Sequence, residues 1–129
     1  MKMSYISVLI LTIILSACAS NSNIKPIENS VIHVVLIWLQ DAGNQEHMQK
    51  VAKITEQLKT IPEVKELRVG SSIPSNRKIV DDSFDLGIYM EFESKEDMEI
   101  YLQHPKHQEV TRKIIKPLTR KIVVYDISN

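Results

Sequence analysis

The chain has 129 residues, and its 16 basic and 16 acidic side chains balance to a formal net charge of zero. That balance leaves no strong field to attract nucleic acid or an anionic membrane surface, so nucleic acid is excluded as an expected partner. The length suits one domain with one core. The single cysteine rules out an intramolecular disulfide, so the domain depends on its core alone or on its core together with a partner subunit.

The first 17 residues have the composition of a secretory signal. Lys2 gives a basic start, residues 5–15 form an almost unbroken apolar run, and small residues follow. The run is too short for a membrane-spanning helix. Leu15-Ser16-Ala17-Cys18 resembles the lipobox of bacterial lipoproteins, whose cysteine is acylated and becomes the first residue of the mature protein. An ordinary signal peptide followed by a chance cysteine is the alternative.

The lipobox resemblance implies a signal peptide over residues 1–17 and lipidation of Cys18. The protein would then be lipid-anchored in the cell envelope, on the extracytoplasmic side of a membrane. In a cell with two membranes the outer one is expected, because Ala19 rather than Asp follows the cysteine. Residues 18–30 are polar and rich in Asn and Ser, which predicts a flexible tether between the lipid and the domain.

The domain opens with a predicted strand over residues 31–39. Apolar residues fall on both of its faces and β-branched residues dominate, which is typical of a strand buried on both sides. A small sheet that helices cover on one face therefore needs a second cover on the other. Apolar residues at three- and four-residue steps then predict a helix from Gln45, which Pro62 ends, and a short strand at residues 64–70.

A loop over residues 71–82 leads to the clearest alternation in the chain, in which every second residue from Phe84 to Phe92 is apolar. This pattern predicts a third strand whose even positions face the helices.

A helix capped by Ser94 follows, and His104-Pro105 interrupts it because proline clashes with the preceding turn. Pro105 is suited to begin a new helix, and a fourth strand is predicted at residues 121–127. The apolar side of the second helical segment consists of Val110, Ile114 and Leu118. The order β-α-β-β-α-β predicts a ferredoxin-like α+β fold, an antiparallel four-stranded sheet with helices on one face.

Four histidines are the main candidates for chemistry. None has the spacing of a metal motif, so neither a metal nor a cofactor is expected, and any one histidine is by default a packed or surface residue. They are His33 in the first strand, His47 early in the first helix, and His104 and His107 on either side of Pro105.

Several segments in the correct order resemble the stress-responsive A/B-barrel (Dabb) domain family. They are the first strand over residues 31–38, the turn Ile61-Pro62-Glu63-Val64, the corner at residues 92–97, the signature Tyr101-Leu102-Gln103-His104-Pro105-Lys106-His107, and the closing segments 116–118 and 123–126. The resemblance places a Dabb domain at residues 31–129. It implies a homodimer in which two sheets pack through the faces opposite their helices, giving a dimeric α/β barrel, and the doubly apolar first strand independently agrees.

The resemblance also implies site residues. In a plant polyketide cyclase of the family, which closes its substrate by intramolecular aldol chemistry, the catalytic Tyr and His match Tyr101 and His107, and His33 has a counterpart. The third-strand pocket histidine of that enzyme corresponds to Leu86 here. A histidine can remove a proton next to a carbonyl while a tyrosine hydroxyl polarises the oxygen. The implied catalytic pair is thus Tyr101 and His107, and His33 and His104 belong to a pocket between sheet and helices.

Three functions stay open from the sequence. The first is a lipid-anchored Dabb domain that binds a small apolar ligand, or has a stress-related role, without turnover. The second is a lyase or cyclase acting on a polyketide-like carbonyl substrate. The third, haem-degrading chemistry as found in the wider group of dimeric α/β barrels, needs an axial histidine and a roomy pocket. In a straight helix Tyr101 and His107 would point about 240° apart, so the second function requires the helix to break between them.

Overall fold

The computed structural model describes residues 29–128, so the predicted signal peptide, Cys18 and most of the predicted tether lie outside the described residues. No helix within that described range is long and apolar enough to cross a membrane. The elements are β1 (Val31–Leu39), α1 (Gln45–Glu56), the 3-10 helix η1 (Gln57–Thr60), β2 (Glu66–Ser71), β3 (Leu86–Phe92), α2 (Lys95–Gln103), α3 (Pro105–Val110), the π-helical turn η2 (Thr111–Ile115), α4 (Lys116–Leu118) and β4 (Thr119–Ser128). This order confirms the predicted ferredoxin-like α+β fold.

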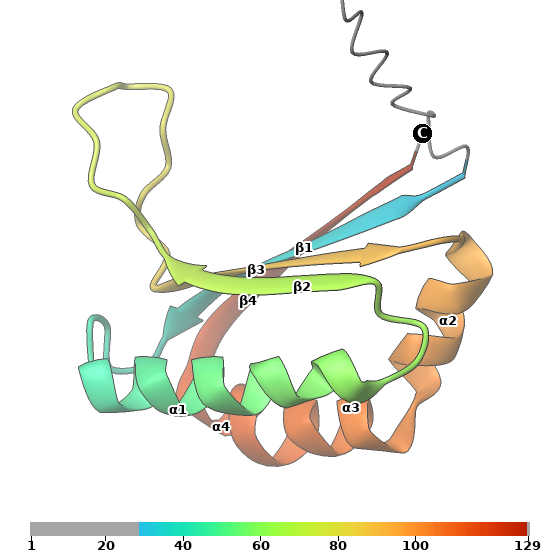
Figure 1. The fold of residues 1–129 in the computed structure, drawn as a ribbon. Coiled ribbons are helices and arrows are strands. Elements are labelled where there is room, and N and C mark those ends of the chain that lie inside the picture. Colours follow the sequence, from blue (N-terminus) through green and yellow to red (C-terminus); the bar gives the residue numbers. More distant parts are fainter. Residues whose placement is uncertain (1–28, 129) are drawn as a thin grey trace, which may run out of the picture.

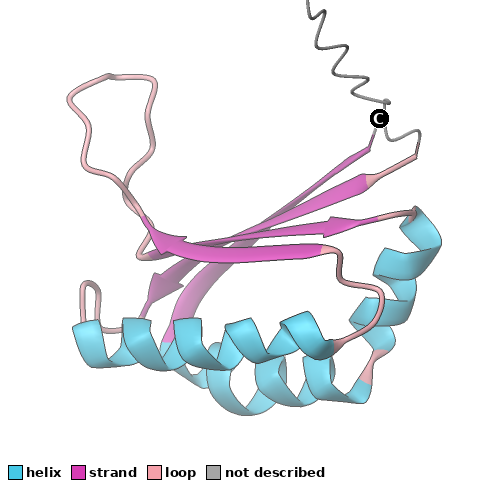
Figure 2. Cartoon of the chain, viewed as in Figure 1, coloured by secondary structure: helices cyan, strands magenta, loops and turns pink. Residues whose placement is uncertain are grey.

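The four strands form one antiparallel sheet in the order β2-β3-β1-β4. All the helices lie on one side of it, and the opposite side is free of helices (Figures 1 and 2). Because β1 lies between β3 and β4, its residues 31–37 have a partner on both sides. His33 lies opposite Met90 of β3 and opposite Asp126 of β4, and this register decides which side chains surround His33.

The core fills the space between the sheet and the helices. The even positions of β3 from Leu86 to Phe92 are all buried, which confirms the predicted alternation within the strand. Phe84 departs from the prediction because the strand begins two residues later. Its half-buried ring instead meets the Trp38 ring edge-on at 6.2 Å between centroids, outside the main core cluster.

A buried carboxylate fixes the turn between β1 and α1. Asp85 accepts hydrogen bonds from the backbone N–H of Leu39 at 2.7 Å and of Gly43 at 2.6 Å. Gly43 has φ +74°, a left-handed conformation that glycine adopts without a steric cost. Asn44 then caps α1 by accepting from the His47 N–H at 3.0 Å. The helix becomes a 3-10 turn at Gln57 and ends before Pro62.

The second helical layer is interrupted twice. Ser94 caps α2 by accepting from the Asp97 N–H at 3.1 Å, and the extended backbone of His104, with ψ 130°, separates α2 from α3, as predicted at Pro105. The π-helical turn η2 then follows, and it buries Ile115 rather than the predicted Ile114. A π turn repeats every five residues rather than four, so the residue on the same face as Val110 is one position further along.

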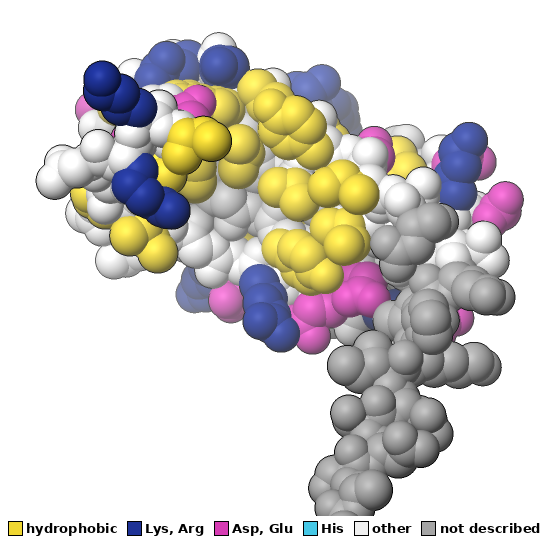
Figure 3. Space-filling view, turned by 90° about the horizontal axis from the view of Figure 1, so that it is seen from above, with side chains coloured by type: hydrophobic (Ala, Val, Ile, Leu, Met, Phe, Trp, Pro, Cys, Tyr) yellow, Lys and Arg dark blue, Asp and Glu magenta, His cyan; other side chains and the backbone are white. Residues whose placement is uncertain are grey.

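The sheet surface opposite the helices, here called the open face, is largely apolar. Its centre consists of alternate residues of β1 and β4, where a patch of hydrophobic side chains gathers (Figure 3). Tyr125 and Ile127 are 55% and 52% exposed, although both lie in a strand. The apolar members are Ile32, Val34, Leu36, Val123, Tyr125 and Ile127. An apolar surface of this kind on a small domain marks an interaction site.

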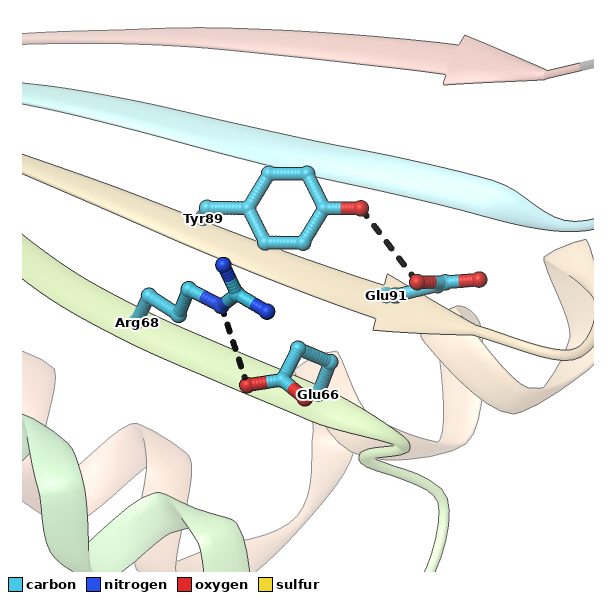
Figure 4. Close-up of polar contacts among 4 residues, drawn as sticks. All are labelled: Glu66, Arg68, Tyr89 and Glu91. Atoms are coloured by element: carbon cyan, nitrogen blue, oxygen red, sulfur yellow. Dashed lines mark hydrogen bonds and ion pairs between the residues drawn. The ribbon is translucent and has the colours of Figure 1, made fainter.

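One corner of the open face is polar. Arg68 Nε pairs with Glu66 Oε1 at 3.3 Å, and the Tyr89 hydroxyl donates to Glu91 Oε2 at 3.3 Å (Figure 4). Partial burial raises the pKa of Tyr89, and the neighbouring Glu91 charge adds to this effect. Tyr89 therefore stays protonated, and the β2–β3 edge presents solvated polar groups beside the apolar patch of β1 and β4.

Candidate functional site

A cavity of about 320 Å³ lies between the sheet and the helices. Aliphatic side chains from β1, β3, β4, η1 and η2 form most of its wall, and this composition is typical of a small-molecule site. A few polar side chains interrupt the apolar wall. They are His33, Thr55, Tyr101, His107, Thr111 and Lys116.

The break in the second helical layer brings Tyr101 and His107 together. Tyr101 lies in α2 and His107 in α3, and their ring centroids are 4.5 Å apart at an interplanar angle of 42°. In an unbroken helix the two side chains would point about 240° apart. The change of direction at His104-Pro105 is therefore what allows both rings to line the same cavity.

The hydrogen bonds of His107 determine which ring nitrogen carries its proton. Nδ1 lies 3.0 Å from the carbonyl oxygen of Leu102, and a carbonyl can only accept, so Nδ1 carries hydrogen. Nε2 is then the acceptor in the neutral ring, with the Thr111 hydroxyl 3.3 Å away. Burial lowers the pKa of His107, and the bond to Leu102 opposes this shift in part. At neutral pH the ring is therefore uncharged, with a lone pair on Nε2.

Tyr101 is the other half of the pair. It is 1% exposed, and burial, the sole cause of the shift, raises its pKa strongly. The hydroxyl consequently remains protonated and can donate a hydrogen bond. No residue in the described part of the chain is hydrogen-bonded to that hydroxyl. Tyr101 lines the cavity, so this donor is available to a molecule that binds there.

His33 is held in place from β4. Its Nδ1 lies 2.6 Å from Asp126 Oδ1, and because a carboxylate only accepts, Nδ1 carries hydrogen and Nε2 is left as the other ring atom for contacts. The His33 ring meets Tyr101 and Phe92 edge-on at 6.3 and 6.4 Å between centroids. The site thus has two oriented imidazoles near one phenol hydroxyl.

The structure places the other two histidines outside the cavity wall. His104 caps α3, where its Nδ1 accepts from the Lys106 N–H at 3.2 Å, and it does not line the cavity. Its position is thus the packed, backbone-bonded one that is the default for a histidine. His47 lies in the first turn of α1, and Leu86 belongs to the core rather than to the cavity wall.

Sequence reasoning missed four polar residues of the site. Asp126 lies in the predicted fourth strand, and only the β1–β4 register, which pairs it with His33, identifies it as part of the site. Thr55, Thr111 and Lys116 gave no signal as a group, because the 3-10 and π turns beside them set which way they face. No three His, Cys, Asp or Glu side chains of residues 29–128 gather closely enough to hold a metal ion.

Fold and site together define the class: a ferredoxin-like α+β domain with an apolar cavity between its sheet and helices and an apolar open face. The family model described as Stress responsive A/B Barrel Domain matches residues 31–129, so the chain belongs to this family, as its motifs predicted. Comparison with curated proteins gives no match.

Solved structures share this fold at low sequence identity. A Dabb family protein from Mesorhizobium loti superposes with a TM-score of 0.65 at 20% identity, covering 78% of this chain and 96% of its own. A dimeric ferredoxin-like protein of unknown function from Thermobifida fusca gives 0.65 at 18%, covering 79% and 92%. Hydroxynitrile lyase from Passiflora edulis gives 0.69 at 22%, covering 78% and 94%. At these identities the likeness shows the fold.

The pKa of His107 predicts a pH dependence of stability. Burial holds this pKa below its ordinary value of 6.5, so the unfolded chain takes up the proton first as the pH falls, and acidification favours unfolding. The free energy of unfolding, measured with urea, should therefore be lower at pH 5 than at pH 7.5. His107→Gln should reduce this difference. His47→Gln, which changes a histidine outside the cavity, should leave it intact, and an equal effect of both variants would contradict the assignment.

Proposed function

We propose that this protein is a lipid-anchored, homodimeric Dabb-domain protein that binds a small apolar ligand bearing a carbonyl oxygen. The observation that carries the proposal is the protonated hydroxyl of Tyr101, which has no hydrogen-bond partner among residues 29–128, on a side chain that lines an apolar cavity of about 320 Å³. An apolar ligand would fill such a cavity, and one oxygen atom of the ligand would accept a hydrogen bond from the Tyr101 hydroxyl. Ligand binding of this kind therefore requires no residues other than those that line the cavity.

A second candidate is a lyase or cyclase that uses Tyr101 and His107 as its acid–base pair. Neutral His107 carries a lone pair on Nε2, beside the Thr111 hydroxyl, and with that hydroxyl turned away it could accept a proton from a carbon or hydroxyl of the substrate. Tyr101 would stabilise the oxygen on which negative charge develops. The Passiflora protein of the same fold, which is named a hydroxynitrile lyase, supports this class of reaction.

The homodimer is supported by the open face. Two sheets that pack through this face would cover the apolar residues of β1 and β4, which no helix covers, and homodimer interfaces are enriched in such apolar surface. The structures from Thermobifida fusca and Bacteroides fragilis are both named as dimeric. A twofold axis in the interface would place the same patch on both subunits.

The anchor is supported by the sequence alone. Leu15-Ser16-Ala17-Cys18 follows an apolar run and precedes a polar segment, and the first described strand starts at Val31. Two or more acyl chains on Cys18 would hold the domain firmly, because a single chain gives only marginal membrane binding.

The ligand proposal is tested with acetophenone, an apolar molecule with one carbonyl. Tyr101→Phe should weaken its binding about two- to tenfold, the effect of losing one neutral hydrogen bond, as measured by isothermal titration. Tyr89→Phe is the matched control, because its hydroxyl lies on the open face (Figure 4), and it should bind as the native protein does. Equal binding by both variants would exclude the Tyr101 hydroxyl as the ligand donor.

A measurement of turnover distinguishes the ligand-binding protein from the lyase or cyclase. A lyase releases cyanide from mandelonitrile at a rate that falls by at least about a hundredfold in His107→Gln, since general acid–base catalysis contributes about 10²–10⁴-fold. A binding protein holds acetophenone and shows no release above the uncatalysed rate.

The dimer is tested by a charge in the middle of the open face. Val34→Lys should convert the protein to monomers, because an unpaired charge buried in an apolar contact is costly, and sedimentation of the lipid-free Cys18→Ser protein measures this. Ile100→Lys changes an equally apolar residue that is 52% exposed on α2 and should leave the dimer intact. A folded native monomer at micromolar concentration would refute the proposal.

The anchor is tested by Cys18→Ser. The native protein should partition into the membrane fraction, and the variant should lose most of this partitioning because it has no thiol to acylate. Ser16→Thr keeps the cysteine and serves as the control. Equal partitioning of native protein and Cys18→Ser would show that Cys18 is not the anchor.

A further inference from the structure

The two ends of the cavity differ in chemistry. At one end His33 lies beside Tyr101, with 6.3 Å between ring centroids. The segment formed by α4 and the start of β4 lies beside the other end of β1, where the Gln40 N–H donates to the carbonyl of Leu118 at 2.9 Å. Lys116 lines the cavity in this second region. His33 and Ile37 both line the cavity and lie four positions apart in β1, about 13 Å in an extended strand, so the cavity runs along β1 with His33, Tyr101 and His107 at one end and the exposed Lys116 near the other.

The end of the cavity near Lys116 has an excess of positive charge. Residues 111–121 contain five basic side chains and no acidic one. Three of these five already have partners: Lys113 pairs with Glu109 at 2.7 Å, Lys121 lies over the Trp38 ring at 4.1 Å, and Arg120 Nε donates to the Leu39 carbonyl at 3.1 Å. No carboxylate of residues 29–128 lies within ion-pair distance of Lys116. Its charge is therefore available to an anion at the cavity mouth.

Thr55 supplies a third feature, on the wall formed by α1. Its side chain is 0% exposed and lines the cavity, and its hydroxyl has no hydrogen-bond partner among the described residues. Leaving a buried hydroxyl unpaired destabilises a folded protein, and valine, which has nearly the same shape, would avoid that cost. A ligand oxygen beside Thr55 would remove the penalty when the ligand binds.

From these three features we infer that the ligand is an elongated apolar carboxylate with a polar oxygen along its body: the carboxylate lies at Lys116, the oxygen bonds to Thr55, and the far end reaches Tyr101. The inference rests on the proposed ligand-binding function and narrows its ligand class. It assigns ligand contacts to Lys116 and Thr55, two residues that have no part in the proposed acid–base chemistry of Tyr101 and His107. Attraction at an exposed ammonium is modest and sensitive to salt, so Lys116 selects among ligands, while the apolar wall supplies most of the affinity.

The carboxylate is tested with decanoate and 1-decanol, which differ only in the charged end, on the full chain carrying Cys18→Ser. Decanoate should bind about three- to tenfold more tightly, within or slightly above the range of a partly exposed ion pair. Lys116→Gln should abolish this preference, whereas Lys116→Arg and the control Lys113→Gln should retain it. Equal binding of the two probes by the native protein overturns the carboxylate assignment but keeps the cavity function, and binding of neither overturns both.

The role of Thr55 is tested with Thr55→Val and a set of hydroxydecanoates that differ in hydroxyl position. At least one of them should bind the native protein more tightly than decanoate does, and Thr55→Val should abolish that gain while leaving decanoate binding unchanged. Without ligand, Thr55→Val should melt about 4–8 °C higher, the shift expected when an unpaired buried group is removed from a domain of this size. No gain for any hydroxyl position, or a lower melting temperature, would show that Thr55 has a structural role only.

Discussion

The site depends on Pro105, a residue that has no backbone N–H to donate to a helix. Since proline cannot continue the preceding helix, α2 ends at Gln103 and α3 begins at Pro105 with a new direction. His104 completes the break by capping α3 through its own side chain. This corner brings Tyr101 and His107 to 4.5 Å between ring centroids and leaves room for a cavity below the sheet. A residue at position 105 that allowed one straight helix would point the two rings in different directions, and they would no longer line the same cavity.

Tyr101 and His107 share one electrostatic property: burial favours the neutral form of both side chains. Burial raises the pKa of Tyr101 and lowers that of His107, so one keeps its proton as a donor and the other keeps its lone pair as an acceptor. In water the two groups would differ less in these roles. The apolar wall therefore does more than hold a hydrophobic ligand, because it also reinforces the protonation states that make Tyr101 and His107 complementary.

The features that could be predicted from the sequence depend on residues that are close together in the chain. The alternation of β3 and the break at Pro105 depend on side-chain period and on proline geometry, and both are found where predicted. The Asp126 bond to His33 joins residues 93 positions apart, so it depends on strand register rather than on neighbouring residues. The shift from Ile114 to Ile115 arises in a π turn, which the apolar pattern of a regular helix could not reveal.

Strand β1 couples the two faces of the sheet. Its odd residues, such as His33, face the cavity, and its even residues, such as Val34, lie on the open face. A cavity is a region of missing packing contacts, and this weakens the layer around it. Covering the open face with a second subunit would add contacts to the same strand from its other side. The proposed dimer would thus stabilise the backbone that positions His33.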